Sequence, residues 1–416
     1  MWSGWQEKNN MAALKRHQKK IGVGGAIITP YAKRLVNQVL DSGRISYGPM
    51  LRRFEEEFAR VSGRKFAVSA NSGTSALQVA FHALKEKDGW KDGDEVIVPA
   101  ITFVATSNVV LQNGLKPVFV DVDPYTYHID PKKIDAAVTP RTRAIAPVHL
   151  FGMSADMDPI MAIARKHKLR VVEDSCEAVG VRYKGRPVGM DGDISCFSTY
   201  MAHLVTTGVG GLALTNDPDI AVHMRSLVNH GRDSIYVSMD ADKGLTGKAR
   251  FDMANKRFSF VSIGYSYRMT ELEGALGIAE LKYLKKNIKL RQRYAAYLLK
   301  GMKRYEKFLQ LPTRPADREH AYMMFTMVIK DPALFTRDEI VAWLEDWNVE
   351  TRYMMPLINQ PVYRKMFGDL ESKYPVTARI NHHGFYIGCH PEMNKKHLDY
   401  ILAVFDAFFK NKGLIS

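Results

Sequence analysis

Continuous apolar runs of about five residues recur through the first half of the chain, each followed by a stretch with helical spacing. The runs occupy residues 66–70, 95–99, 118–123, 144–149 and 169–174. A strand that is buried on both faces carries such a continuous run, and regular alternation with helices is typical of a parallel sheet. The pattern therefore predicts an α/β fold with a mostly parallel sheet, whose ligands gather at the carboxyl ends of the strands.

Helices are predicted between these strands, and a long helical run begins near residue 270. Residues 234–260 are polar and aromatic, and they are predicted to form an extended connection. After residue 311 the composition changes, and a strand at 324–329 with helices at 337–348 and 397–409 indicates a smaller α/β domain. We predict an N-terminal arm (1–26), a large domain (27–310) and a small C-terminal domain (311–416).

Composition narrows the class of protein. The 416 residues are 46% hydrophobic and 25% charged, which is ordinary for a globular enzyme. No apolar run is long enough to span a membrane, and the first 20 residues are too polar for a signal peptide, so we predict a cytoplasmic protein with no membrane partner. The three cysteines lie far apart, which predicts no disulfide framework and no metal site.

The net charge of +15 is spread along the chain, and its densest basic run is residues 15–20. We interpret this run as a solvated arm or helix face, and no motif of a nucleic-acid binder is present, so nucleic acid is not a predicted partner. A positive surface would instead steer small anions such as a nucleotide diphosphate.

The stretch 197–211 carries the most specific signal. It resembles the cofactor-lysine segment of the DegT/DnrJ/EryC1/StrS family, whose members are sugar aminotransferases of fold type I that use pyridoxal phosphate (PLP). In this chain His203 stands at the lysine position, and Val209 replaces a glutamate of the family pattern. An imidazole cannot form the covalent link that holds PLP. The resemblance extends from about residue 45 to residue 402 and implies a fold type I PLP-dependent transferase.

The same resemblance implies cofactor-binding roles elsewhere. Asp174 matches the aspartate that pairs with the pyridine nitrogen, and a carboxylate there keeps that nitrogen protonated. Phe103 matches the aromatic residue that stacks on the ring. The remaining matched residues surround the cofactor phosphate: Gly73, Thr74, Ser198 and Ser266. Ser266 replaces an asparagine that reaches the partner subunit's phosphate. Taken alone, each of these residues also has an ordinary structural reading as a helix cap, a core aromatic or a buried serine.

The motif 173–178, Glu-Asp-Ser-Cys-Glu-Ala, resembles the 3-dehydratase branch of the family more closely than its aminotransferases, and it adds Glu177 to the predicted cofactor site. Residues 229–233, 357–361 and 384–390 resemble the same branch, whose members carry histidine at the lysine position. One subgroup uses an iron–sulfur cluster, which three scattered cysteines cannot supply. The other subgroup is similar to GDP-4-keto-6-deoxy-D-mannose 3-dehydratase and needs no metal. Predicted substrate-binding residues are Tyr47, Arg232 and Arg352.

This resemblance implies a reaction. Pyridoxamine phosphate (PMP) would condense with a nucleotide-linked 4-keto-6-deoxyhexose, and His203, titrating near neutrality, would remove a proton from the adduct. Loss of the C3 hydroxyl, release of ammonia and regeneration of PMP by L-glutamate would follow. The imidazolium could also protonate the departing hydroxide.

Two other hypotheses remain open from the sequence. The chain could be a nucleotide-sugar aminotransferase whose lysine became histidine, or a non-catalytic binder of PLP or of a nucleotide sugar, with His203 a buried core residue. A homodimer with the active site at the subunit interface is expected from the family. GDP is suggested by the resemblance alone, and nothing in the sequence explains Val209.

Overall fold

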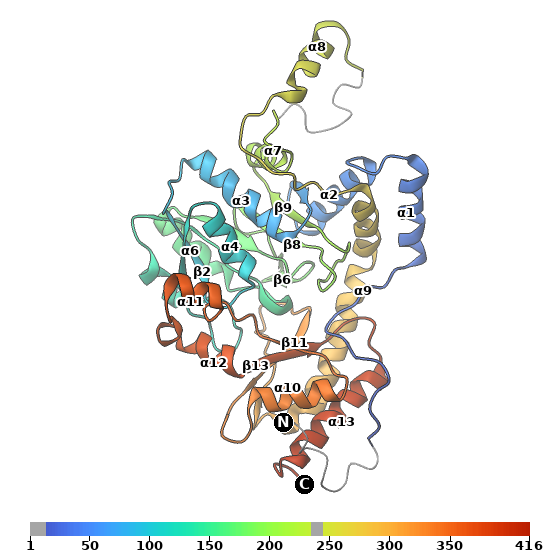
Figure 1. The fold of residues 1–416 in the computed structure, drawn as a ribbon, viewed down its shortest axis with the longest axis vertical. Helices are drawn as coiled ribbons and strands as arrows, with labels where there is room; N and C mark the ends of the chain where they lie inside the picture. Colours follow the sequence, from blue (N-terminus) through green and yellow to red (C-terminus); the bar gives the residue numbers. More distant parts are fainter. Residues whose placement is uncertain (1–13, 234–243) are drawn as a thin grey trace.

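A computed structural model describes residues 14–233 and 244–416, and the chain is built around two sheets (Figure 1). The larger sheet has seven strands in the order β1-β9-β8-β5-β4-β2-β3. Strand β9 runs antiparallel to both of its neighbours, and the other neighbouring strands are parallel. The predicted mostly parallel sheet is therefore confirmed. Its strands are β1 (Phe66–Ala70), β2 (Glu95–Pro99), β3 (Lys116–Val120), β4 (Thr142–Ile145), β5 (Arg170–Asp174), β8 (Ile194–Ser198) and β9 (Gly211–Thr215).

Helices cover both faces of this sheet, which is why its strands carry continuous apolar runs. Within β9, Leu212 and Leu214 belong to one core, and Ala213 between them belongs to the core on the opposite face. The helices of this part of the chain are α1 (Pro30–Ser42), α2 (Pro49–Val61), α3 (Gly73–Asp88), α4 (Val104–Gln112), α5 (Pro131–Ile134), α6 (Met157–His167) and α7 (Pro218–Leu227).

The smaller sheet has four antiparallel strands in the order β10-β11-β13-β12. Ile21 in the N-terminal segment joins it through a bridge to Val349. The strands are β10 (Leu309–Gln310), β11 (Met324–Ile329), β12 (Thr351–Tyr353) and β13 (Gly384–Gly388), and the helices are α10 (Arg337–Asp346), α11 (Pro361–Phe367), α12 (Pro375–His383) and α13 (Lys395–Asn411).

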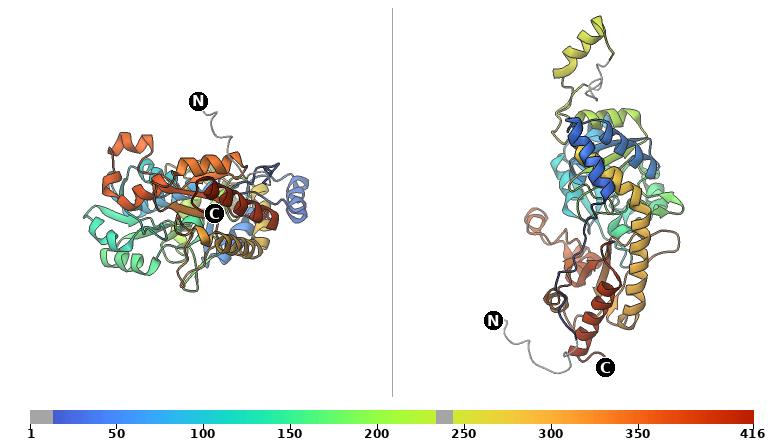
Figure 2. Two further views of the ribbon diagram at one scale, coloured as in Figure 1. Left: turned by 90° about the horizontal axis from the view of Figure 1, so that it is seen from below. Right: turned by 90° about the vertical axis from the view of Figure 1, so that its right-hand side faces the viewer.

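Helix α9 (Glu271–Met302) ties the two sheets together, running from one to the other in the side view (Figure 2). It starts at a capping box, in which Thr270 and Glu273 satisfy each other's backbone N–H groups. Ala275 near its start belongs to the same core as Leu212, and Leu298 near its end packs with the smaller sheet. Because one helix serves both cores, the three-part division of the chain stays a proposal.

Three predicted elements differ from the structure. Strands β3 and β4 begin two residues earlier than the apolar runs suggest and also end earlier. Strand β3 ends at Val120, and Asp121 after it accepts hydrogen bonds from the backbone of Val376 and Thr377 at the start of α12. The predicted extended connection is wrong at residues 247–255, which form α8 (Gly247–Asn255), a segment rich in helix-forming residues. Residues 234–243 of that prediction lie outside the described residues, as do residues 1–13 of the predicted arm.

Helix α8 stands away from the body of the molecule (Figures 1 and 2), and none of its residues is buried. The segment that follows it exposes large apolar side chains, with Phe258 81% and Ile263 88% exposed. This projecting part of the chain therefore leaves apolar surface uncovered within the single chain.

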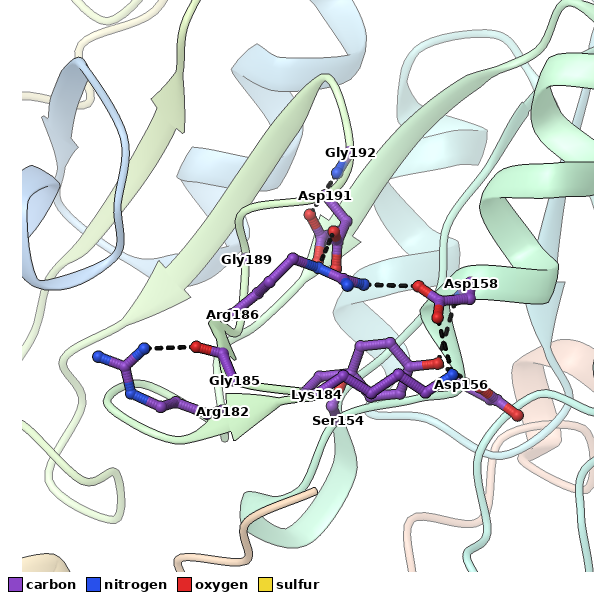
Figure 3. Close-up of polar contacts among 12 residues, drawn as sticks. Ser154, Asp156, Asp158, Arg182, Lys184, Gly185, Arg186, Gly189, Asp191 and Gly192 are labelled. Carbon is purple, nitrogen blue, oxygen red and sulfur yellow. Dashed lines mark hydrogen bonds and ion pairs between the residues drawn. The ribbon is translucent and has the colours of Figure 1, made fainter. Parts of the chain in front are cut away.

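A short hairpin, β6 (Arg182–Tyr183) and β7 (Arg186–Pro187), is fixed to the start of α6 by the polar contacts in Figure 3. Arg186 bonds both Asp158, at 2.6 Å, and Asp191, at 2.9 Å. The Tyr183 hydroxyl donates to Asp156 at 2.6 Å. These contacts hold the chain between β5 and β8, whose carboxyl ends carry Asp174 and Ser198.

We predict that Gly274→Ala destabilises the fold by about 1–3 kcal/mol, although alanine favours a helix by itself. A Cβ at position 274 would lie 2.8 Å from the backbone of Leu51 at the start of α2. Two bonds to Glu271, from the N–H groups of Met50 and Leu51, hold that backbone in place. Urea denaturation measures the free energy of unfolding.

Gly301→Ala is the matched control on the same helix, since the atoms nearest its Cβ would belong to the Leu402 side chain, which can rotate away. Equal stability for Gly274→Ala and the parent protein would contradict the rigid α2–α9 contact.

Candidate active site

The turn between β1 and α3 lies pressed against strands β8 and β9. A Cβ on Gly73 would lie 2.8 Å from the Cβ of Ser198, and a Cβ on Gly211 would lie 2.4 Å from the carbonyl oxygen of Ser72. Only glycine fits at either position without moving backbone. The N-terminus of α3 is thereby placed beside Ser198, and the N–H groups of its first turn point out of the helix, as in a phosphate cradle.

Asp174 lies at the end of β5 and is buried. One carboxylate oxygen accepts a bond from the Thr106 hydroxyl at 2.7 Å, and the other accepts one from the backbone N–H of Cys176 at 3.2 Å. Phe103 immediately precedes α4, and its side chain is 58% exposed. A fixed carboxylate and an open aromatic face suit a planar ring with a basic nitrogen.

His203 lies in the turn after β8, where its backbone N–H bonds the carbonyl of Tyr200 at 2.9 Å. Its Nδ1 atom is buried and has no hydrogen-bond partner among the described residues. Burial lowers the pKa of His203 to about 4, the charge of Arg291 lowers it further, and the Cys176 backbone opposes them. The prediction that His203 titrates near neutrality is therefore wrong for the chain itself: its imidazole is neutral at pH 7.

Glu177 is the predicted site residue whose protonation changes near neutral pH. Burial raises the pKa of its carboxyl to about 7, with a smaller contribution from the charge of Asp174. Its Oε2 atom accepts a bond from the N–H of Phe151, a residue held at φ 60°. The cysteine between Asp174 and Glu177 stays a thiol, because burial raises the pKa of Cys176 well above its usual value.

Two charged residues near His203 were missed from the sequence. Burial raises the pKa of Glu280 on α9 to about 7, and the Thr206 backbone and Arg291 oppose that shift. Arg291, also on α9, is buried and donates to the carbonyls of Met323 and Cys389. Their helical spacing looks like an ordinary solvated face. In the fold, Arg291 is buried against the chain around the smaller sheet, and Glu280 is partly buried beside the backbone of Thr206.

Tyr47, Arg232 and Ser266 lie together in a cavity of about 770 Å³ between α2, β1 and the segment before α9. The Tyr47 hydroxyl contacts Glu55 at 3.3 Å, and the Ser266 hydroxyl accepts a bond from Arg268 at 2.9 Å. The structure thus separates these three predicted residues from the group around Asp174.

Arg352 lies on β12, directly across from Tyr386 of β13, and its side chain pairs with Glu350 at 2.6 Å. Burial raises the pKa of Tyr386, and the charge of Glu177 raises it too, while Arg352 lowers it. Tyr386 therefore lies near enough to both Arg352 and Glu177 to be affected by their charges, and it brings the smaller sheet close to the predicted cofactor site.

Val209, the departure that the sequence leaves unexplained, is 51% exposed at the tip of the loop before β9. The Thr207 hydroxyl donates to its carbonyl at 2.6 Å. Nothing in the structure explains why valine stands there.

In the described part of the chain, no helix has the length and apolarity that crossing a membrane requires. Over the same residues, no cluster of three or more histidine, cysteine, aspartate or glutamate side chains could hold a metal ion.

Residues 27–406 match the model of the DegT/DnrJ/EryC1/StrS aminotransferase family. The chain is 34% identical to GDP-perosamine synthase of Caulobacter vibrioides over 87% of its own length and 90% of that protein. It is also 34% identical to dTDP-4-dehydro-2,6-dideoxy-D-glucose 3-dehydratase of Saccharopolyspora spinosa, over 86% of its own length and 80% of that protein.

Among solved structures, the chain is similar to Escherichia coli GDP-4-keto-6-deoxy-D-mannose-3-dehydratase with bound hydrated PLP. The TM-score is 0.82 and the identity 27%, with 93% of this chain and 100% of that chain covered. The similar proteins thus include both a synthase of an amino sugar and 3-dehydratases, so similarity alone does not choose between the two reactions.

We expect acid to destabilise the cofactor-free protein through His203. The unfolded histidine, with a pKa of 6.5, binds a proton at pH values where the folded one, at about 4, does not. This difference costs stability as the pH falls from 6.5 to 4, by about 1–2 kcal/mol at pH 5. Denaturation of the parent and of His203→Gln at pH 7 and pH 5 measures it, and a variant that loses as much stability as the parent would contradict the shift.

Glu177 is predicted to carry a proton at pH 6 and to lose it by pH 8. Infrared difference spectroscopy should show the carbonyl band of a protonated carboxyl that fades over this range and is missing from Glu177→Gln. Glu280→Gln is the control, because burial raises the pKa of Glu280 to about 7 as well. This variant should lose only the part of the band that belongs to Glu280. An unchanged band in Glu177→Gln would refute the prediction.

Proposed function

The chain belongs to the DegT/DnrJ/EryC1/StrS aminotransferase family, and we propose that it is a PMP-dependent nucleotide-sugar 3-dehydratase. The proposed reaction removes the C3 hydroxyl of a nucleotide-linked 4-keto-6-deoxyhexose and releases ammonia. The observation that carries this proposal is His203: the lysine position of the family holds a neutral, partly buried imidazole whose buried Nδ1 atom has no partner among the described residues.

The residues around Asp174 fit PLP and its amine form. The turn at Gly73 and the Ser198 hydroxyl would receive the phosphate, Asp174 would pair with the ring nitrogen, and Phe103 would cover the ring. When bound, the cofactor supplies an amine that condenses with the keto group and a ring that accepts electrons. The stretch 197–211 contains no lysine, so nothing in it can hold the cofactor covalently.

His203 would act as the base. Its imidazole is neutral at pH 7, because burial disfavours the charged form, so a ring nitrogen is free to accept a proton. A lysine at this position would be occupied by the covalent link to the cofactor in the resting enzyme. Negative charge that develops on a bound substrate would raise the pKa of His203 above its value in the empty chain.

Glu177 would supply the complementary proton reservoir. Its carboxyl is close to half protonated at pH 7, three residues after Asp174 and in contact with the Phe151 backbone. The two groups would thus have different roles. His203 would accept a proton at Nδ1 or Nε2, and Glu177 would donate a proton near neutral pH.

L-glutamate would restore PMP after each turnover, and a homodimer would complete the site across two subunits. The large exposed apolar side chains of the segment after α8 support such an assembly, since a lone chain leaves them in water.

A second function is favoured by the similarity to GDP-perosamine synthase. An aminotransferase with histidine in place of lysine would form PMP from PLP and glutamate and would pass the amine to the sugar. It would release an amino sugar and no ammonia, so the two functions differ in one measurable product.

We expect the purified protein, given PLP, glutamate and a nucleotide-linked 4-keto-6-deoxyhexose, to release ammonia in step with sugar consumption. The ring absorbance should shift to the PMP form with glutamate alone. Amino sugar without ammonia would establish the aminotransferase. Neither PMP nor ammonia, with GDP-, UDP- and dTDP-linked sugars, would establish a non-catalytic binder.

His203→Lys should abolish ammonia release and should hold PLP covalently, so that borohydride fixes the cofactor to the chain. His167→Lys on the surface of α6 is the control and should change neither property. Ammonia release retained by His203→Lys would remove His203 from its role as base.

A further inference from the structure

The chain before α1 is fixed to the smaller sheet and runs from there to α1 in the side view (Figure 2). The N–H and the carbonyl of Ile21 both bond the backbone just before β12, at 2.8 and 2.9 Å. One residue later the strands come closer still: a Cβ on Gly388 of β13 would overlap the Gly22 carbonyl oxygen and would lie 3.0 Å from the Cα of Val23. We call residues 20–25 the strap, because backbone contacts hold this segment against the sheet.

The far end of the strap reaches the turn that carries His203. A Cβ on Gly24 would lie 3.4 Å from the Cα of Ala202, the residue before His203, which is ordinary van der Waals contact. The Val23 side chain packs against the core cluster that contains Leu204 of the same turn. The strap therefore touches both the smaller sheet and the His203 turn, two parts of the chain that are far apart in sequence.

Glu350 joins the strap to Arg352. Its Oε2 atom accepts a bond from the N–H of Val23 at 2.9 Å, and its Oε1 atom accepts one from the Arg352 guanidinium at 2.6 Å. Burial would raise the pKa of this carboxyl, but the Val23 bond and the charges of Arg352 and Lys20 lower it below its usual value. The carboxylate is thus charged at neutral pH, and both of its bonds are charge-assisted.

Arg352 depends on these bonds for a fixed position. Its side chain is 51% exposed, and a long side chain in water loses much of its rotamer freedom when it is held in one place. One guanidinium nitrogen donates to Glu350, and another donates to the carbonyl of Thr351 at 2.7 Å. Together they hold the guanidinium on β12, directly across from Tyr386 of β13.

We propose that the strap is a positioning element of the active site and that Glu350 is the residue through which it positions Arg352. The strap would keep the His203 turn in a fixed place relative to the smaller sheet, and Glu350 would keep Arg352 where it meets the substrate. This inference rests on the proposed function, which makes His203 the base, and on the predicted role of Arg352 in substrate binding. Displacement of a reacting group by about 1 Å can cost about a hundredfold in rate, so contacts outside the chemistry can decide it.

Hydrogen exchange of the full-length protein without cofactor, followed by mass spectrometry, tests the strap. Gly388→Ala would push the strap off β13, because the added Cβ overlaps the Gly22 carbonyl oxygen. We expect exchange to become about tenfold faster or more, both in residues 20–25 and in the His203 turn (199–207), since the two would open together. Gly301→Ala is the control and should leave exchange in both segments unchanged.

Steady-state kinetics with the nucleotide-linked 4-keto-6-deoxyhexose tests Glu350. In Glu350→Gln the amide oxygen can still accept the N–H of the strap, but the charge that holds Arg352 is lost. KM for the sugar should therefore rise about tenfold, and kcat should change less than about threefold. Gly388→Ala should show the opposite pattern, with kcat lowered about tenfold or more because the His203 turn is displaced.

Glu339→Gln is the matched control for Glu350→Gln. The Glu339 carboxylate also bonds one backbone N–H, that of Thr336 at 2.7 Å, and one cation, Lys412 at 2.6 Å, and both partners lie outside the strap. This variant should leave KM and kcat unchanged. A role of Glu350 in stability alone would lower the free energy of unfolding and would leave KM of the folded variant at the parent value.

Two results would overturn the proposal. One is faster exchange in residues 20–25 of Gly388→Ala while residues 199–207 stay as protected as in the parent protein. The other is an unchanged KM in Glu350→Gln. If Gly388→Ala does not fold, Glu350→Gln serves for the exchange test as well, because it weakens the bond to Val23. Exchange needs no substrate, so coupled exchange without ammonia release would refute the proposed function and leave the strap's role standing.

Discussion

The contact between the turn before α3 and strands β8 and β9 is the constraint on which the site depends. Backbone approaches backbone so closely there that Gly73 and Gly211 leave no room for a side chain. This contact sets the N-terminus of α3 beside Ser198, and the adjacent strand β5 brings Asp174 to the same edge of the sheet. The helix N-terminus and the carboxylate that we assign to the cofactor in our proposal are thus brought together by one packing contact.

Burial then decides the protonation of the groups around that edge. It lowers the pKa of His203 and raises that of Glu177, because a low-dielectric environment favours the neutral form of either group. At neutral pH, the His203 imidazole is therefore uncharged and the Glu177 carboxyl is close to half protonated. The same effect acts on Glu280, where α9 packs behind the His203 turn.

The structure also divides charge between two neighbouring sites. Around His203 the cationic Arg291 is buried and bonded to backbone carbonyls, while the cavity that holds Tyr47 contains two arginines with no carboxylate partner among the described residues. A net charge of +15 shows that cations are in excess, and the packing of α2, β1 and the segment before α9 decides where two of them are concentrated. The positive potential over this part of the surface depends on that placement more than on the total charge.

The sequence by itself determined the layered α/β fold and the strands 66–70, 95–99 and 324–329, because an apolar run long enough to be buried on both faces is a local property. Its motifs also indicated the family, which the similarity of residues 27–406 establishes. The chemical state of the site was decided only by tertiary structure. Glu55 and Arg225 are 170 residues apart, and Arg291 lies 98 residues from Cys389, so their pairing and burial appear in no local pattern. Helix α8 is another example, because it forms in a polar stretch that the sequence pattern predicts to be an extended connection. The pKa of a side chain depends on how deeply it is buried and on which charged groups lie near it. Both are set by residues distant in sequence, so they exist only in the folded chain.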